Sequence, residues 1–228
     1  MDFGNKNLWL LFEWNGTSIY VTQTLLATWV VMAVLLVIAV VIRLRLSSFK
    51  DVPKGLQNGI ETLVEIMENF TKSTMGEGYE GYGGFFFGIF AFILLSNYSG
   101  LVGLRPPTSD LATTAALAIT SFLLIHLTGL RKLKGGYFKS YLSPLPLLLP
   151  LNIMGELSKP ISLCFRLFGN VLGGFIILSL VYEMLPFALR FVLPDVLHLF
   201  FDILVGALQA FIFTVLSMTF IQQKSVRN

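Results

Sequence analysis

The stretch PISLCFRLFGN, residues 160–170, places Arg166 inside a run that otherwise has the composition of a lipid-soluble helix. An arginine near the middle of a membrane costs between about 2.5 and more than 10 kcal/mol, depending on how much water and lipid deformation reach it. A guanidinium cannot escape this cost by losing its proton. The stretch therefore predicts a membrane helix that presents its arginine to something that offsets the charge.

The whole chain has the composition of an integral membrane protein. Of its 228 residues, 55% are hydrophobic and 13% are charged, which is too apolar for an ordinary soluble domain. The single cysteine, Cys164, and two distant histidines, His126 and His198, form no disulfide or metal-binding pattern. We therefore expect no cofactor and no metal. The net charge of +3 is carried by short loops and does not indicate nucleic-acid binding.

Long uncharged segments predict an all-α membrane protein with about five membrane-embedded helices in a single domain, residues 1–228. Residues 49–78 differ, because apolar residues recur there at helical spacing opposite Glu61, Glu65 and Glu68. This segment is expected to lie at the inner membrane surface or on a partner. The predicted elements are spanning helices at 14–42, 81–104 and 111–130, an amphipathic surface helix at 49–78, and a long, tilted helical hairpin at 151–183 and 195–223.

Basic residues indicate the orientation in the membrane. Arg43 and Arg45 follow the first span, and RKLK, residues 131–134, follows the third. Because cytoplasmic loops are enriched in Lys and Arg, we expect a multi-pass protein of the cell (inner) membrane with its N-terminus outside and its C-terminus in the cytoplasm. The first apolar stretch is longer than the core of a signal peptide, so we expect it to be kept. The only basic residues in the loops expected outside are Lys6, Arg105 and Arg190.

Two polar stripes at steps of three and four residues follow the predicted hairpin. On the second stripe the ionisable groups precede the deeper Gln209, a gradient that suits a water-filled inlet ending partway across the membrane. Polar residues within 97–99 and 108–110 could line the same cavity, and Glu156 lies on the other side of the arginine. The pattern favours two half-paths over one pore. The stripes are Lys159, Ser162, Arg166, Asn170 and Gly173, and Asp195, His198, Asp202, Gly206 and Gln209.

Simpler structural roles for the same residues stay open. An ion pair of Arg166 with Asp202 or Glu156 would also offset its charge. His198 alone is more often an interfacial histidine than a proton carrier. Gln209 could simply hold helices together, which polar side chains do in membranes for about 0.6 kcal/mol on average.

The motif KPISLCFRLFGN, residues 159–170, together with LQAFIFTVLS, residues 208–217, resembles the ATP synthase subunit a family. The resemblance extends in order from about residue 80 to 223 and includes PTSDL, NIMGELSKP and ALQAF. It implies the ion-translocating stator of a rotary F-type ATP synthase, a non-catalytic subunit embedded in membrane lipid. The implied partners are the subunit c ring, the peripheral stalk subunit b and the rest of the F1Fo complex.

The resemblance also implies roles for individual residues. Arg166 matches the arginine that faces the carboxylates of the rotating ring and keeps two half-channels apart. Gln209 matches a glutamine that orients this arginine, and Asn170 an asparagine one turn away. Asp110 matches an acidic residue near the outer half-channel, although it could equally be the N-cap of the following helix. The residues assigned to ion translocation are Arg166, Gln209, Asn170, Asp202, His198, Asp110, Glu183 and Ser162.

Two positions depart from the family pattern. Some proton-driven members carry a glutamate where this chain has Phe175, and a histidine where it has Asp202. The carboxylate of Asp202 would then serve the inlet alone, with His198 or Glu183 nearby. The coupling ion stays open between protons, which we expect, and sodium ions, because the ring largely sets that choice.

Other classes of function fit the sequence less well. A self-contained transporter or channel predicts repeated halves or a continuous polar path, and neither is visible. An intramembrane zinc protease would need a ligand set such as HExxH. Nothing resembles a GxxxxGK[ST] phosphate-binding loop, so any ATP chemistry must belong to partner subunits.

Overall fold

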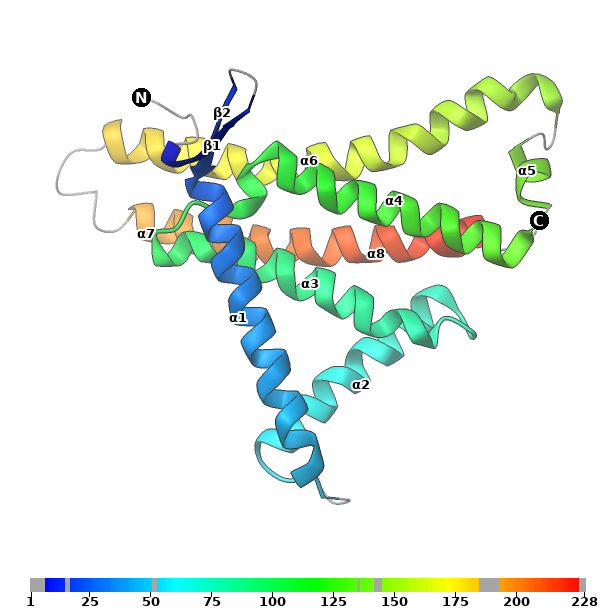
Figure 1. The fold of residues 1–228 in the computed structure, drawn as a ribbon, viewed down its shortest axis with the longest axis horizontal. Coiled ribbons are helices and arrows are strands. Elements are labelled where there is room, and N and C mark those ends of the chain that lie inside the picture. The colour runs from blue at the N-terminus through cyan, green and yellow to red at the C-terminus, as the bar shows by residue number, and fades with distance from the viewer. Residues whose placement is uncertain are drawn as a thin grey trace. The chain divides into compact units, whose positions relative to one another are not determined.

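The computed structural model describes residues 7–14, 17–50, 53–134, 136–141, 145–184 and 193–225 (Figure 1). Two compact units account for them. Unit 1 comprises the described residues of 1–52, 91–110 and 168–210, and unit 2 those of 53–90, 111–167 and 211–228. Helices α3 (Gly83–Tyr98), α6 (Leu149–Met184) and α8 (Gly206–Ser225) contribute residues to both units.

Helices dominate the described chain, and five of the described helical segments are long and apolar enough to cross a membrane. This confirms the predicted all-α membrane fold. The segments end within a few residues of most predicted limits because charged and proline-rich stretches interrupt the apolar runs. The tilt of the hairpin in a membrane stays a prediction. The five segments are Gln23–Ser48, Gly83–Val102, Leu111–Leu133, Pro146–Met184 and Val196–Ser225.

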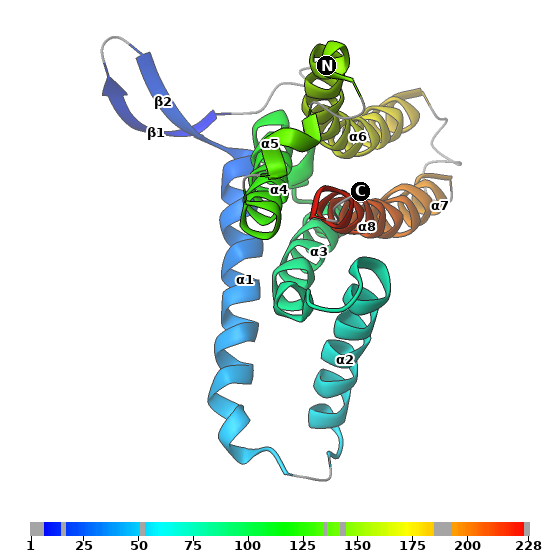
Figure 2. The same ribbon diagram turned by 90° about the vertical axis from the view of Figure 1, so that its right-hand side faces the viewer.

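Unit 1 opens with an antiparallel β-hairpin that the sequence analysis did not predict (Figure 2). Strands β1 (Asn7–Trp14) and β2 (Thr17–Thr22) lead directly into helix α1 (Gln23–Arg45). The Thr22 hydroxyl caps this helix by accepting a hydrogen bond from the Leu25 amide at 3.3 Å. The predicted start of the first helix at residue 14 is therefore wrong, because an uncharged segment reports apolarity and not the backbone conformation.

The rest of unit 1 comprises the C-terminal end of α3 with the turns that follow it, and the described part of residues 168–210 from the predicted helical hairpin. Two short 3-10 turns, η3 (Ser99–Val102) and η4 (Pro107–Ser109), follow α3. The segment predicted as one helix at 195–223 is divided into α7 (Leu193–His198), the π-helical turn η7 (Leu199–Val205) and α8. Single π-helical turns such as η7 occur frequently at functional sites.

Unit 2 is built around a small apolar core. Its further elements are α2 (Leu56–Met75), η2 (Glu80–Tyr82), α4 (Leu111–Leu133), α5 (Gly136–Tyr141) and η5 (Pro146–Leu148). A 3-10 turn, η1 (Leu46–Ser48), precedes this unit in the chain. Hydrogen bonds join Tyr79 to Ser225 and, at 2.9 Å, Tyr82 to Thr128. The buried core consists of Met75, Tyr79, Phe86, Ile125, Met218 and Ile221.

Helix α2 lies inside the segment predicted to be amphipathic. Its only buried residues among those described are Thr71 and Met75, near its end. Leu56, Leu63 and Ile66 are 77%, 49% and 57% exposed. The apolar face of α2 is therefore available to lipid or to a partner.

A charged cluster in unit 2 joins α6 to the end of α8. Glu156 Oε1 accepts hydrogen bonds from Lys159 Nζ and Lys224 Nζ, both at 3.1 Å. The Lys224 ammonium lies 3.6 Å from the centroid of the Tyr141 ring and 5.2 Å from that of Tyr137. Burial raises the pKa of both tyrosines, so they stay protonated and hydrogen-bonded to each other at 2.9 Å.

Replacing Glu156 by glutamine is expected to destabilise the protein by about 1–3 kcal/mol, because two partly buried ammonium groups lose their counter-charge. Thermal unfolding of the purified protein in detergent measures the effect as a lower midpoint. Glu65→Gln on the exposed surface of α2 is the matched control and should leave the midpoint unchanged. Equal midpoints for the two variants would show that the Glu156 cluster does not stabilise the fold.

Candidate functional site

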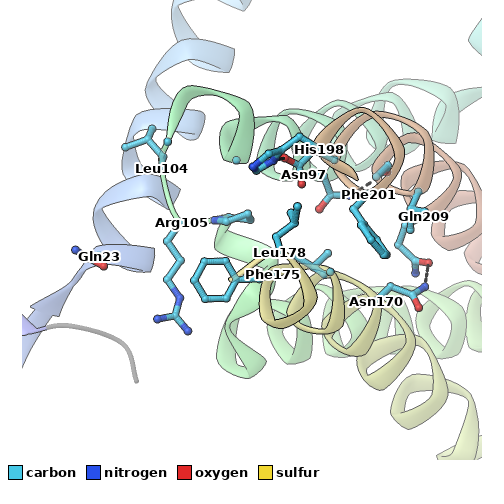
Figure 3. Close-up of a pocket in the computed structure, with 18 of the residues that line it drawn as sticks. Gln23, Asn97, Leu104, Arg105, Asn170, Phe175, Leu178, His198, Phe201 and Gln209 are labelled. Carbon is cyan, nitrogen blue, oxygen red and sulfur yellow. Dashed lines mark hydrogen bonds and ion pairs between the residues drawn. The ribbon is translucent and has the colours of Figure 1, made fainter. Parts of the chain in front are cut away.

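Unit 1 encloses a cavity of about 610 Å³ (Figure 3). Its wall is formed by the start of α1, the C-terminal end of α3 with the loop that follows, the second half of α6, and the chain from His198 to Gln209. Most of the wall is apolar, so the few polar side chains determine which ligand or ion the cavity can hold. Its polar side chains are Gln23, Asn97, Arg105, Asn170, His198, Asp202 and Gln209.

An imidazole and a carboxylate form a pair in this wall. His198 Nδ1 lies 2.6 Å from Asp202 Oδ2, one turn along the chain, and the two side chains are 30% and 15% exposed. The π-helical turn η7 contains Asp202 and follows directly after His198. A short contact of this kind can hold or transfer a proton between the ring nitrogen and the carboxylate oxygen.

A second pair in the wall consists of two amides from different helices, Asn170 of α6 and Gln209 of α8. Asn170 Nδ2 donates a hydrogen bond of 2.7 Å to Gln209 Oε1, as the dashed line in Figure 3 marks. Gln209 is 2% exposed, whereas Asn170 is exposed. The bond fixes the direction of the Gln209 amide, since its oxygen is turned toward Asn170. The structure thus brings four predicted site residues, Asn170, His198, Asp202 and Gln209, to one cavity.

Buried hydrogen bonds attach the end of α3 to the junction of η7 and α8. Thr108 Oγ1 donates to Asn97 Oδ1 at 2.6 Å, and Asn97 Nδ2 donates to the Gly206 carbonyl at 2.9 Å. Asn97 and Thr108 are 3% and 0% exposed. Because both polar groups of the Asn97 amide are satisfied, this link is well defined in position.

Arg105 is a cavity residue that sequence reasoning missed. In the sequence it stands out only as a charge in a loop expected outside. Its guanidinium lies 5.2 Å from the centroid of the Phe175 ring, beside which Figure 3 shows it, and its Nε donates to Ser109 Oγ at 3.4 Å. Spacing along the chain carries no signal for this contact, because Arg105 and Phe175 belong to distant segments. The departure from the family pattern at Phe175 was the one available hint.

Arg166 belongs to the part of α6 in unit 2, where its side chain is exposed. Ser162, one turn earlier, is also exposed. Within unit 2, Glu156 pairs with Lys159 and Lys224 and not with Arg166. Asp202, in unit 1, pairs with His198. These pairings give no support to the alternative in which Arg166 serves as a structural ion pair.

Two expected inlet residues are outside the cavity wall. Asp110 Oδ2 accepts a hydrogen bond of 2.9 Å from Thr24 Oγ1, which attaches the start of α1 to the segment before α4. Glu183 is exposed near the end of α6. Neither residue lines the cavity, and their roles in ion translocation stay predictions.

The five described helical segments that are long and apolar enough to cross a membrane define the chain as a multi-pass membrane protein. It belongs to the ATP synthase A chain family, whose sequence profile matches residues 25–222. This confirms the resemblance seen in the motifs.

Relatives of known name match over most of the chain. ATP synthase subunit a of Moorella thermoacetica is 37% identical over 213 residues, which cover 92% of this chain and 93% of the relative. ATP synthase subunit a 3 of Pelobacter propionicus is 38% identical over 200 residues, covering 86% and 84%. ATP synthase subunit a of Geobacter sulfurreducens is 36% identical over 200 residues, with the same coverage.

Proposed function

We propose that this chain is the ion-translocating stator subunit of a rotary F-type ATP synthase in the cell membrane, with its N-terminus outside. It works beside a subunit c ring and peripheral stalk b subunits, while the partner subunits carry the ATP chemistry. The observation that carries the proposal is the cavity whose wall contains the His198–Asp202 pair, in a member of the ATP synthase A chain family.

The cavity serves as the inlet from the outer side. A proton that arrives through its water reaches His198 or Asp202, which lie within hydrogen-bond distance of each other. From Asp202 it moves toward the Asn170–Gln209 pair, where a ring carboxylate accepts it. Amides do not titrate near neutral pH, so Asn170 and Gln209 orient the groups around the path and do not store the proton.

Arg166 keeps the inlet apart from the exit path. A fixed guanidinium attracts the ionised carboxylate of the ring and lowers its pKa, so the carboxylate must release its ion before it passes. The guanidinium stays charged at every relevant pH, which makes this barrier permanent. The exposure of Arg166 on α6 supports this role, because a partner can reach its side chain.

We further propose protons as the coupling ion. Asp202 is the one carboxylate among the described residues that line the cavity, and it is already paired with His198. The same wall contains the cationic Arg105. This charge balance is unfavourable for a hydrated sodium ion, whereas a proton needs only groups that can accept and release it.

ATP-driven ion uptake by the reconstituted whole complex tests the choice of ion. We expect uptake in sodium-free buffer that a protonophore collapses. Uptake that requires sodium and survives the protonophore would refute the proton assignment and leave the stator role in place. Purification of the chain without a c-ring or b subunits under mild conditions would count against the stator role itself.

A further inference from the structure

We infer that Gly100 is a positioning residue for the inlet: its lack of a side chain leaves the space that the Asp202 carboxylate occupies while it pairs with His198. The inference rests on the proposed function of the cavity. Gly100 lies in the 3-10 turn η3, at the C-terminal end of α3, and lines the cavity together with both members of the pair.

The contact between Gly100 and the carboxylate is close. A Cβ atom added at Gly100 would lie 3.3 Å from Asp202 Oδ2, 3.4 Å from its Cγ and 3.5 Å from its Oδ1. The nearest of these atoms, Oδ2, is also the oxygen that lies 2.6 Å from His198 Nδ1. A methyl group at position 100 would therefore press on the oxygen that makes the short contact with the imidazole.

The segments that carry Gly100 and Asp202 are held together by a hydrogen bond and by close packing. The Asn97 amide fixes the end of α3 to the Gly206 carbonyl. A Cβ atom added at Gly206 would lie 3.0 Å from Asn97 Cβ, and one added at Gly174 would lie 3.2 Å from Phe201 Cδ1. The π-helical turn is thus packed closely against α3 and α6, so the carboxylate itself must shift to accommodate a larger residue.

The glycine is not required by its own backbone conformation. Four glycines in the described chain have positive φ, namely Gly55, Gly76, Gly78 and Gly103, and Gly100 is not among them. An alanine at position 100 can therefore adopt the same backbone without strain. Its effect should come from the contact with Asp202 and not from a distorted turn.

The experiment compares Gly100→Ala with Gly88→Ala in the reconstituted whole complex. Gly88 lies in α3, the helix that precedes η3, and a Cβ atom there would meet nothing within 4 Å. We expect Gly100→Ala to lower the rate of ATP-driven proton uptake by about threefold to tenfold, since small displacements of reacting groups have large effects on rate. The dependence of uptake on the pH of the side that the cavity faces should also change, because the oxygen that is displaced, Asp202 Oδ2, is the one that contacts His198 Nδ1. Gly88→Ala should behave as wild type.

A double variant separates positioning from a general structural effect. In the Asp202→Asn background the inlet carboxylate is gone, so Gly100→Ala should add no further loss. Losses that add in full would overturn the positioning role. So would a Gly100→Ala complex with wild-type rate and pH profile. If Asp202→Asn alone leaves uptake unchanged, the inlet assignment fails; if it lowers uptake while Gly100→Ala matches Gly88→Ala, only the positioning inference fails.

A second variant covers the case in which Gly100→Ala does not assemble. Asp202→Glu keeps the charge and moves the carboxylate by one methylene group. We expect it to lower proton uptake by about threefold or more. Full uptake with a glutamate at position 202 would show that the position of the carboxylate is not critical, and would overturn the inference.

Discussion

Replacing Arg166 by alanine is expected to abolish ion-driven ATP synthesis, with a loss of at least about 100-fold, while the complex still assembles. Without the guanidinium, the ring carboxylate keeps its ion when it reaches the stator, and ions can pass from one half-path to the other. Assembly should persist because the exposed Arg166 side chain is outside the buried core of unit 2. ATP synthesis in proteoliposomes under an imposed proton gradient measures the loss.

Two further substitutions serve as controls for this result. Arg131→Ala removes an exposed cation from the end of α4 and should leave synthesis unchanged. Arg166→Lys should retain little activity, because an ammonium is a compact point charge that can lose its proton in an apolar setting. Normal synthesis by the alanine variant would refute the assignment of Arg166.

Replacing Asp202 by asparagine is expected to slow proton access from outside by about tenfold or more, the size of a typical proton-transfer contribution. The amide keeps the shape of the side chain and can still bond to His198, but it neither accepts nor releases a proton near neutral pH. The rate of ATP synthesis in proteoliposomes under an imposed proton gradient, at several pH values on the side that the cavity faces, measures the effect.

The Glu183→Gln variant is the comparison for Asp202→Asn. The two carboxylates were both candidates for the inlet, but only Asp202 lines the cavity. A loss confined to Asp202→Asn supports the inlet described above. A loss confined to Glu183→Gln would move the inlet to the exposed end of α6 and leave Asp202 as a structural residue.

The membrane helices could be predicted from the sequence because uncharged runs of sufficient length have few alternatives in a membrane. The start of α1 could not be predicted in this way. Residues 17–22 carry no charge, like the first part of α1, yet they form strand β2, paired with β1. The sequence also did not predict the π-helical turn at Leu199–Val205, because no proline marks it and its close contacts with glycines involve distant segments.

The candidate site was predictable where its residues follow one another at helical spacing along the chain. His198, Asp202 and Gln209 were grouped by spacing alone, and the cavity contains all three. The contacts of Arg105 and Gly100 depend on tertiary packing, which spacing does not encode. For the same reason the sequence could not show that Asp110 bonds to Thr24 and does not line the cavity.

Proton flux through the reconstituted membrane sector, stripped of its catalytic subunits, tests the ion-translocation account most directly. Vesicles would contain the c-ring with this chain, the ring alone, or this chain alone, under an imposed membrane potential. We predict rapid proton flux only when the chain and the ring are present together. Equal flux through the ring alone, or through this chain alone, would contradict the account.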